Sequence, residues 1–415
     1  MNMKYVIFGW GAGVAGAQLY TMNKVSFLRS RNIDVYLVYC SVSNEVPDAD
    51  KVVLEPLRKI PSINVREMAI IPAYFTKRKR EKVCKKILDF IDYSDGDDVF
   101  IESNDMLYSF WGELVAKKTG GRNFCFLLEG YFAPREQSQD FFRFKLSREE
   151  IAGTRKKSLE DLFAGDIQEE NNCYFKAFCT NSVEKTAQAD LKTILKGTSI
   201  AEYTVKIANV GRSTKPYVAY LPEEILKFAK QHPTEKILFV MIGGKEKEAP
   251  HAFDADLKSV PNLKVVFTGE LFPIPETLLS AMDVCIASSG CVSVAFRAGA
   301  KTIGYLDDAE KPYGLVGYNE KEKLLLHELL EQVFFGEYCS RYNYDPNARG
   351  KCNTQVMEQE FSKQLSYMVR QRRREYYDTS QVMPKSKVYA VLARTIGRYV
   401  GLYSIYKIKN RMFGK

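Results

Sequence analysis

The sequence has few of the residues that hold structural metals or disulfide frameworks. It contains 3 histidines, and none of its 9 cysteines belongs to a Cys-x-x-Cys pair. A zinc site needs clustered ligands of these types. An odd number of scattered cysteines does not suit a disulfide framework. We therefore expect a protein of the reducing cytoplasm that holds no metal.

The chain also lacks a long, uninterrupted hydrophobic run. The segment between Lys4 and Lys24 is uncharged, but only Tyr5–Phe8 is strongly apolar, and glycines follow at 9, 11, 13 and 16. A membrane-spanning helix needs about 20 mainly apolar residues. This segment is therefore expected to begin a folded domain, and not to be a signal peptide or a membrane anchor.

The overall composition is that of a globular protein, with 46% hydrophobic and 27% charged residues over a length of 415 that suits two domains. The net charge is +9, and residues 362–415 carry 13 Lys or Arg against Glu375 and Asp378, which leaves the rest of the chain at −2. A uniformly basic nucleic-acid-binding protein would not have this distribution. A basic tail lying on an anionic membrane would. A second basic cluster, residues 77–86, forms a helix face of the kind that is usually solvated, and it would add to such a contact if it lay on the same side.

Short apolar runs alternate with helical segments along the chain, which predicts α/β architecture with doubly wound parallel sheets. Residues 133–172 are polar and are predicted as a helical insertion. The predicted strands are 5–8, 34–40, 98–101, 123–128, 174–178, 203–210, 236–242, 264–267, 283–286 and 301–305, and the predicted helices are 17–31, 106–118, 222–231, 274–282 and 292–298.

Three parts follow from this pattern. We expect a Rossmann-like domain over residues 1–200 and a second over residues 201–375. The remaining residues, 376–415, are predicted to hold a basic amphipathic helix, because apolar residues recur at helical spacing through 388–408. This helix would pack on the first domain, touch lipid headgroups, or do both.

Glycines 11, 13 and 16 form a G-x-G-x-x-G pattern directly after the first predicted strand. Small residues there let backbone N–H groups at a helix N-terminus reach a phosphate. A dinucleotide-binding domain also carries an acid at the end of its second strand. Residues 39–41 contain none. An NAD(P)- or FAD-dependent oxidoreductase thus stays an alternative, beside a plain turn and a phosphate or sugar contact.

Glycine and serine motifs end successive strands of the second half in a definite order. Gly243 and Gly244 end one strand, residues 269–271 the next, and residues 288–290 a third, followed by an Ala-Gly segment at 298–299. This order resembles the nucleotide-sugar domain of GT-B fold glycosyltransferases, most closely the family-4 type. Residues 15–18 are similar to the first glycine turn of that family.

The resemblance implies two Rossmann-like domains that face a central cleft, with a C-terminal helix that crosses back. It also implies a diphosphate held at a helix N-terminus and cations that stabilise the departing diphosphate. The same residues have ordinary interpretations as a helix N-cap, a strand-terminal turn and a charged loop. The residues expected to bind donor or phosphate are Gly13, Gly16, Gly243, Gly269, Glu270, Leu271, Ser288, Ser289 and Gly290, and the expected catalytic residues are Glu129, Arg212 and Lys215.

The sequence departs from the family at two places. The paired glutamates of the family are absent, since residues 291–297 contain no acid. The histidine of its first domain is replaced by Glu129, which could orient or deprotonate an acceptor hydroxyl. Glu102 and Asn104 end the neighbouring strand and are predicted on the acceptor side. A non-catalytic GT-B-like subunit is therefore a further alternative.

By this resemblance we expect a metal-independent hexosyltransferase without a cofactor. It would move a sugar from a nucleotide-sugar to a carbohydrate or lipid-linked acceptor in bacterial cell-envelope polysaccharide synthesis. The expected partners are that donor, that acceptor and an anionic membrane at the cytoplasmic face, and not nucleic acid.

Overall fold

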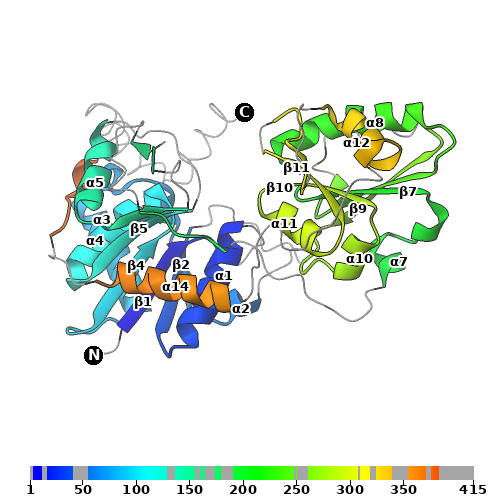
Figure 1. Ribbon diagram of the computed structural model, residues 1–415. Helices are drawn as coiled ribbons and strands as arrows, with labels where there is room; N and C mark the ends of the chain where they lie inside the picture. The colour runs from blue at the N-terminus through cyan, green and yellow to red at the C-terminus, as the bar shows by residue number, and fades with distance from the viewer. Residues whose placement is uncertain are drawn as a thin grey trace. The chain divides into compact units, whose positions relative to one another are not determined.

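The chain forms two compact units. Unit 1 consists of Met1–Cys179 and Thr354–Lys415, and unit 2 of Thr180–Asn353. In the computed structural model (Figure 1), the described residues are 3–11, 16–40, 55–128, 136–154, 159–160, 162–163, 173–178, 190–246, 249, 260–306, 309–317, 324–338, 354–370 and 375–382.

Unit 1 is built on a six-stranded sheet of order β3-β2-β1-β4-β5-β6 in which every strand pair is parallel. The predicted insertion contains the helix α5, as expected, but also β6, a short edge strand that the polar sequence around it hides. The strands are β1 Met3–Gly9, β2 Asp34–Tyr39, β3 Ser62–Asn64, β4 Asp98–Ser103, β5 Arg122–Leu127 and β6 Ile151–Gly153; the α-helices are α1 Gly16–Arg29, α2 Glu55–Arg58, α3 Lys77–Phe90, α4 Met106–Thr119, α5 Glu136–Ser147 and α14 Thr354–Met368; the 3-10 helices include η1 Arg66–Ala69, η2 Pro72–Tyr74 and η8 Thr379–Gln381.

Unit 2 repeats this topology. Its sheet has the order β12-β11-β10-β7-β8-β9, and only β12 is antiparallel. When β7 is counted as the first strand and the sheet is read from β9, this is the same strand order as in unit 1. Two doubly wound sheets were predicted and are confirmed; the predicted strand 174–178 instead makes a single bridge, Tyr174 to Gly153. The elements are β7 Val205–Val210, β8 Ile237–Ile242, β9 Leu263–Gly269, β10 Val284–Ser288, β11 Lys301–Tyr305, β12 Gly314–Leu315, α7 Leu191–Ile194, α8 Leu221–Gln231, α10 Glu276–Ser280, α11 Gly290–Arg297, α12 Leu326–Phe334, η4 Ile200–Glu202 and η5 Pro216–Tyr220.

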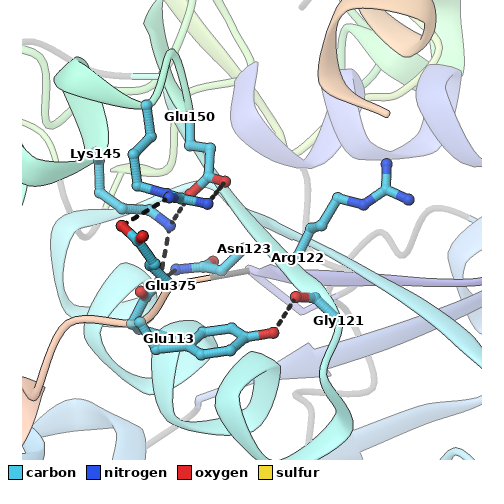
Figure 2. Close-up of a pocket in the computed structure, with 9 residues that line it drawn as sticks. Glu113, Gly121, Arg122, Asn123, Lys145, Glu150 and Glu375 are labelled. Carbon is cyan, nitrogen blue, oxygen red and sulfur yellow. Dashed lines mark hydrogen bonds and ion pairs between the residues drawn. The ribbon is translucent and has the colours of Figure 1, made fainter. Parts of the chain in front are cut away.

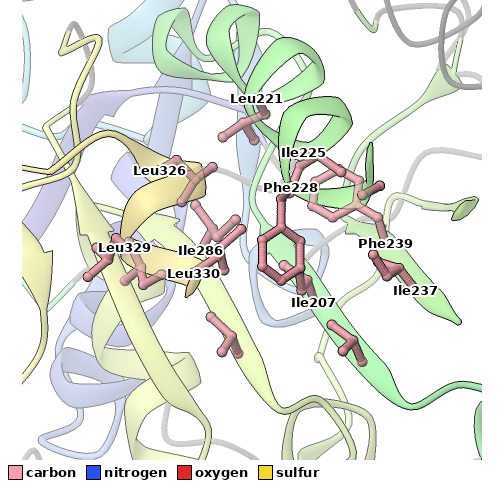
Figure 3. Close-up of a cluster of buried hydrophobic side chains, with 14 of the residues drawn as sticks. Ile207, Leu221, Ile225, Phe228, Ile237, Phe239, Ile286, Leu326, Leu329 and Leu330 are labelled. Carbon is pink, nitrogen blue, oxygen red and sulfur yellow. The ribbon is translucent and has the colours of Figure 1, made fainter. Parts of the chain in front are cut away.

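Helices α8 and α12 cover one face of the unit 2 sheet. Figure 3 shows Leu221, Phe228 and Leu329 of these helices over Ile207 and Ile286 of the strands. A second apolar cluster lies on the opposite face, so every residue of β8 is buried. Burial on both faces explains why this strand reads as a continuous apolar run, and each large side chain contributes about 1.5–3 kcal/mol.

A buried carboxylate joins the two helices. Glu224 of α8 accepts hydrogen bonds from the backbone N–H of His327 at 3.1 Å and from its Nδ1 at 2.7 Å. Burial alone would raise the pKa of Glu224, but the bonds from His327 outweigh it and the pKa is lowered. A carboxylate of lowered pKa stabilises the fold above its ordinary pKa, and that contribution is lost as the pH falls through the lowered value.

Replacing Glu224 by glutamine is expected to reduce the free energy of unfolding at pH 7 by about 1–3 kcal/mol. The loss should shrink as the pH falls from 4.5, where the carboxyl group of the unfolded chain becomes protonated, through the lowered pKa of the folded chain. Glu223→Gln is the control, because Glu223 makes only an exposed pair with Lys227 at 2.8 Å. Urea unfolding of both variants at pH 7 and pH 4 checks this, and equal losses for the two would contradict it.

Helix α14 belongs to unit 1, although the sequence division at residue 375 placed it in the second domain. Phe361 packs against Tyr20 and Phe27 of α1, so α14 contacts α1, and in Figure 1 it crosses in front of the sheet. At the other boundary, Leu195 and the α7 side chains pack in the unit 2 core, so unit 2 begins before residue 200. A helix of the last part of the chain therefore crosses back to unit 1, while the predicted helix at 388–408 lies outside the described residues.

The contact between α14 and the first sheet contains a fully buried charge cluster. Lys24 and Glu102 are both 0% exposed, and their charged atoms lie 3.8 Å apart. Glu102 also accepts hydrogen bonds from Tyr20 at 2.7 Å and from Tyr5, and Lys24 donates to Gln364 of α14 at 3.0 Å. We call Lys24, Glu102, Tyr5, Tyr20 and Gln364 the α14 anchor.

Candidate functional site

The carboxyl ends of β7, β8, β9 and β10 lie along one edge of the unit 2 sheet, because these strands are parallel neighbours. The direction in which successive strands are added reverses between β7 and β10, since β8 and β9 lie on one side of β7 and β10 to β12 on the other. In open α/β sheets, ligands bind outside the carboxyl ends at such a switch point. The predicted donor-side residues of the second half lie at the ends of these strands or directly after them.

A cation and a hydroxyl meet across the switch point. Lys215, in the turn after β7, donates from Nζ to Oγ of Ser288, the last residue of β10, at 2.6 Å. Ser289 follows at φ 52°, a left-handed conformation that is uncommon for a residue with a side chain. Helix α11 then begins at Gly290, so its N-terminal N–H groups and positive dipole end lie at the same edge.

The glycine turns are tied to one another at this edge. The N–H of Gly211 donates to Ile242 O at 2.9 Å, and the N–H of Gly269 donates to Gly244 O at 3.1 Å. Gly243 has φ 82°, and a Cβ added there would lie 3.5 Å from the carbonyl oxygen of Gly211. Glycine therefore suits Gly243 because of its backbone conformation and not because space is lacking, and the positive φ of Gly211 and Gly269 favours glycine in the same way.

An ion pair borders the outer part of the edge. Lys245, after β8, lies 2.9 Å from the carboxylate of Glu270, after β9. Leu271 is half-buried against the core, and Arg212 is exposed. The structure thus gathers Arg212, Lys215, Gly243, Gly269, Glu270, Leu271, Ser288, Ser289 and Gly290 along one edge of unit 2.

A buried polar layer on β7 and β11 was not predicted. Tyr217 donates to Oδ1 of Asn209 at 2.8 Å and stacks on Tyr305 with ring centroids 4.9 Å apart. Burial raises the pKa of Tyr305. Within the described part of the chain, Nδ2 of Asn209 and the Tyr305 hydroxyl lack a hydrogen-bond partner. The sequence feature that could have indicated this layer is Asn209, an amide side chain within the mainly apolar strand β7.

The predicted residues of unit 1 are not brought together. Gly13 and Glu129 lie outside the described residues, and Gly16 is the exposed first residue of α1. Glu102 and Asn104 do end β4, but both side chains are 0% exposed. The α14 anchor surrounds Glu102, and Asn104 donates a hydrogen bond to Glu102 at 2.8 Å. Both residues therefore lie in the interior of unit 1, whereas the sequence predicted them on the acceptor side.

Unit 1 contains a small pocket in which Lys145 and Arg148 pair with the carboxylates of Glu113, Glu150 and Glu375 (Figure 2). Lys145 donates to Glu113 and Glu150 at 2.7 Å each. Burial alone would lower the pKa of Lys145, but the two carboxylates outweigh it and raise the pKa.

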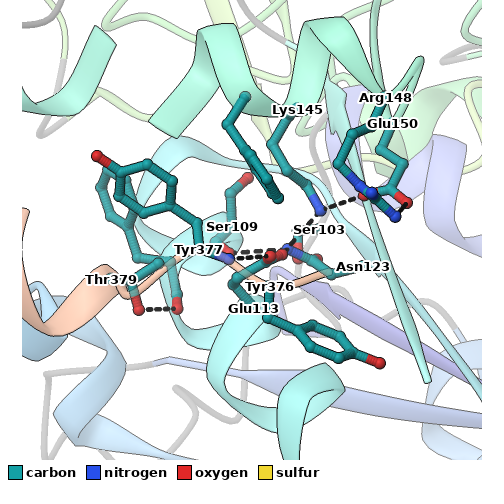
Figure 4. Close-up of polar contacts among 12 residues, drawn as sticks. Ser103, Ser109, Glu113, Asn123, Lys145, Arg148, Glu150, Tyr376, Tyr377 and Thr379 are labelled. Carbon is teal, nitrogen blue, oxygen red and sulfur yellow. Dashed lines mark hydrogen bonds and ion pairs between the residues drawn. The ribbon is translucent and has the colours of Figure 1, made fainter. Parts of the chain in front are cut away.

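Glu375 and Tyr376 also line the pocket, and they begin the segment 375–382, which we call the C-terminal strap. Figure 4 shows the strap against Glu113, which accepts from the Tyr377 N–H at 3.0 Å; Thr379 donates to Phe110 O at 3.1 Å. The network therefore attaches the strap to unit 1. Among the residues that the structure describes, no three His, Cys, Asp or Glu side chains gather where they could hold a metal.

No protein-family model and no curated protein matches the sequence. Solved structures do match. Anabaena Alr3699/HepE in complex with UDP-glucose has a TM-score of 0.59 at 13% identity, covering 88% of this chain and 99% of that one. Trehalose-6-phosphate from Escherichia coli, bound with UDP-2-fluoro glucose, has 0.58 at 10%, covering 89% and 100%. A glycosyltransferase from Rickettsia africae has 0.52 at 12%, covering 100% of each chain.

At these identities the likeness defines the fold. The chain has two Rossmann-like domains of the GT-B glycosyltransferase fold, as the motif order implied. The resemblance to family 4 in particular stays a prediction.

Proposed function

We propose that the protein is a glycosyltransferase that uses a nucleotide-sugar donor. The observation that carries the proposal is the 2.6 Å contact between Lys215 and Ser288 across the switch point, beside the N-terminus of α11. An ammonium group, a hydroxyl and the N-terminal N–H groups of a helix at one place suit a diphosphate. The HepE structure, of the same fold, is a complex with UDP-glucose, which supports this donor class.

In the proposed reaction, the bond between the anomeric carbon and the diphosphate oxygen breaks, and the acceptor oxygen forms the new glycosidic bond. The acceptor hydroxyl gives its proton to a base, for which Glu129 stays the prediction. The nucleoside diphosphate leaves with the electron pair. Lys215, with Arg212 nearby, would neutralise the growing negative charge without a metal.

The proposed acceptor is a carbohydrate or a lipid-linked carbohydrate of the bacterial cell envelope, reached at the cytoplasmic face of the membrane. Among the described helices, none is long and apolar enough to cross a bilayer. Attachment to the surface would use the +11 charge of residues 362–415.

The test is a thermal-shift titration of the full chain with UDP, GDP and NAD. One nucleoside diphosphate should raise the melting temperature, with a stabilisation of about 2.7 kcal/mol when it is present at 100 times its dissociation constant. Gly290→Val should fold but lose this shift, because its side chain would occupy the space at the start of α11. Ser293→Val, farther along the same helix, should keep it. A shift with NAD alone, or an unchanged shift in the folded Gly290 variant, would overturn the proposal.

A further inference from the structure

A polar layer of Asn209, Tyr217 and Tyr305 lies in the core of unit 2 and costs stability. Asn209 is 0% exposed within the mainly apolar β7, and among the described residues its Nδ2 has no hydrogen-bond partner. The buried Tyr305 hydroxyl likewise has none there. A buried polar atom without a partner destabilises the fold, and an apolar side chain would avoid the penalty. Exceptions of this kind occur mainly where function requires them.

The layer joins the same two segments that meet through Lys215 and Ser288. Tyr217 follows Lys215 by two residues in the chain, and Tyr305 is the register partner of Ser288 in the parallel pair of β10 and β11. The two tyrosine rings stack with their centroids 4.9 Å apart and an angle of 21° between their planes. The segment after β7 is therefore held to β10 and β11 twice, by this stack in the core and by the 2.6 Å contact at the edge.

Tyr217 also ties its segment back to β7. Its hydroxyl donates to Oδ1 of Asn209 at 2.8 Å, which closes a loop over residues 209–217. A Cβ added at Gly211 would lie 3.8 Å from the Tyr217 hydroxyl and 4.0 Å from Cδ of Lys215. The hydroxyl and the stem of the lysine thus lie beside the same glycine, so a movement of the Tyr217 ring would change the space in which Lys215 lies.

Lys215 depends on its surroundings for its position, since a lysine side chain is a flexible stem that loses much entropy when it is fixed. A cation stabilises a leaving group best when it is already in place as the charge develops. We infer that Tyr217 is a positioning residue, whose hydrogen bond to Asn209 holds the turn so that Lys215 reaches Ser288 and, in the proposed reaction, the donor diphosphate. The inference rests on the proposed function and adds a residue on which that site depends.

The first test measures the position of Lys215 without a substrate. Tyr217→Phe removes the hydroxyl that bonds to Asn209 and keeps the ring. The matched control is Tyr220→Phe, in the same 3-10 helix η5, because that side chain is 41% exposed. The full-length protein is treated with acetic anhydride, and peptide mass spectrometry gives the acetylation rate of Lys215 relative to that of the exposed Lys230.

Tyr217→Phe should raise this ratio by about 2–10-fold, the factor that one buried hydrogen bond contributes. Tyr220→Phe should leave the ratio unchanged, and thermal melting shows whether each variant is folded. A Tyr217 variant that melts at a lower temperature but keeps the wild-type ratio would mean that the residue only stabilises unit 2. That result, or an equal rise in both variants, would overturn the inference.

The second test separates positioning from stability by kinetics. In product formation from a UDP-sugar, Tyr217→Phe should lower kcat by about 2–10-fold with KM unchanged. It should have no further effect in a protein that already carries Lys215→Met, because it acts through that lysine. An equal loss in the Lys215→Met background would overturn the inference. If no nucleotide-sugar is turned over, the proposed function fails, while the acetylation ratio still decides whether Tyr217 holds Lys215.

Discussion

Replacing Lys215 by methionine is expected to lower the rate of sugar transfer by about 10²–10³-fold. The ammonium group that meets Ser288 at 2.6 Å would no longer balance the charge of the leaving diphosphate. The side chain is only half-buried, so the folded state should change little. Product formation from a UDP-sugar, followed under saturating and limiting donor, checks this.

The comparison variants decide what the loss means. Lys215→Arg keeps the positive charge and should retain part of the rate, while Lys230→Met, on the exposed side of α8, should retain all of it. A rise in KM with an unchanged kcat would assign Lys215 to ground-state binding of the donor and not to stabilisation of the leaving group. Full activity in the methionine variant would remove Lys215 from the mechanism.

Replacing Lys24 by methionine is expected to destabilise unit 1 by about 3–5 kcal/mol, the largest stability effect that the structure indicates. Glu102 would stay wholly buried without its cation, 3.8 Å away in wild type. The double variant Lys24→Met, Glu102→Gln should recover much of the loss, because neither charge is then left uncompensated. Urea unfolding measures both, and a single variant as stable as wild type would contradict this role of the α14 anchor.

The same lysine predicts a pH dependence. Burial lowers the pKa of Lys24, although the neighbouring Glu102 opposes the shift. The unfolded chain therefore binds more protons at this position than the folded chain between the lowered pKa and 10.5. The contribution of Lys24 to stability should rise with pH across that window, and the Lys24→Met variant should lose this part of the slope.

The strands and glycine turns could be predicted because their signals are local. The run at β8 is apolar since both faces of the strand are covered, and Gly243 stands where φ is positive. The prediction for Glu102 used the same kind of local rule, in which a carboxylate at the end of a strand lies at the open edge of the sheet. That placement failed because α14, more than 250 residues later in the chain, covers it.

Features that depend on packing partners were not visible. Apolar spacing shows that α14 has a buried face, but it does not show which sheet that face covers. Asn209 and Tyr305 lie in separate strands, and only the structure shows that their polar atoms are buried on either side of Tyr217.

The return of the chain to unit 1 at Thr354 makes unit 2 an insertion within a discontinuous unit 1. Residues 180–353 are one continuous segment and suit separate expression. Stopping the chain at residue 179 would instead leave unit 1 without α14, with Lys24 and Glu102 uncovered. A protease cut after unit 2, followed by loss of the fragment that contains α14, would therefore expose the core of unit 1.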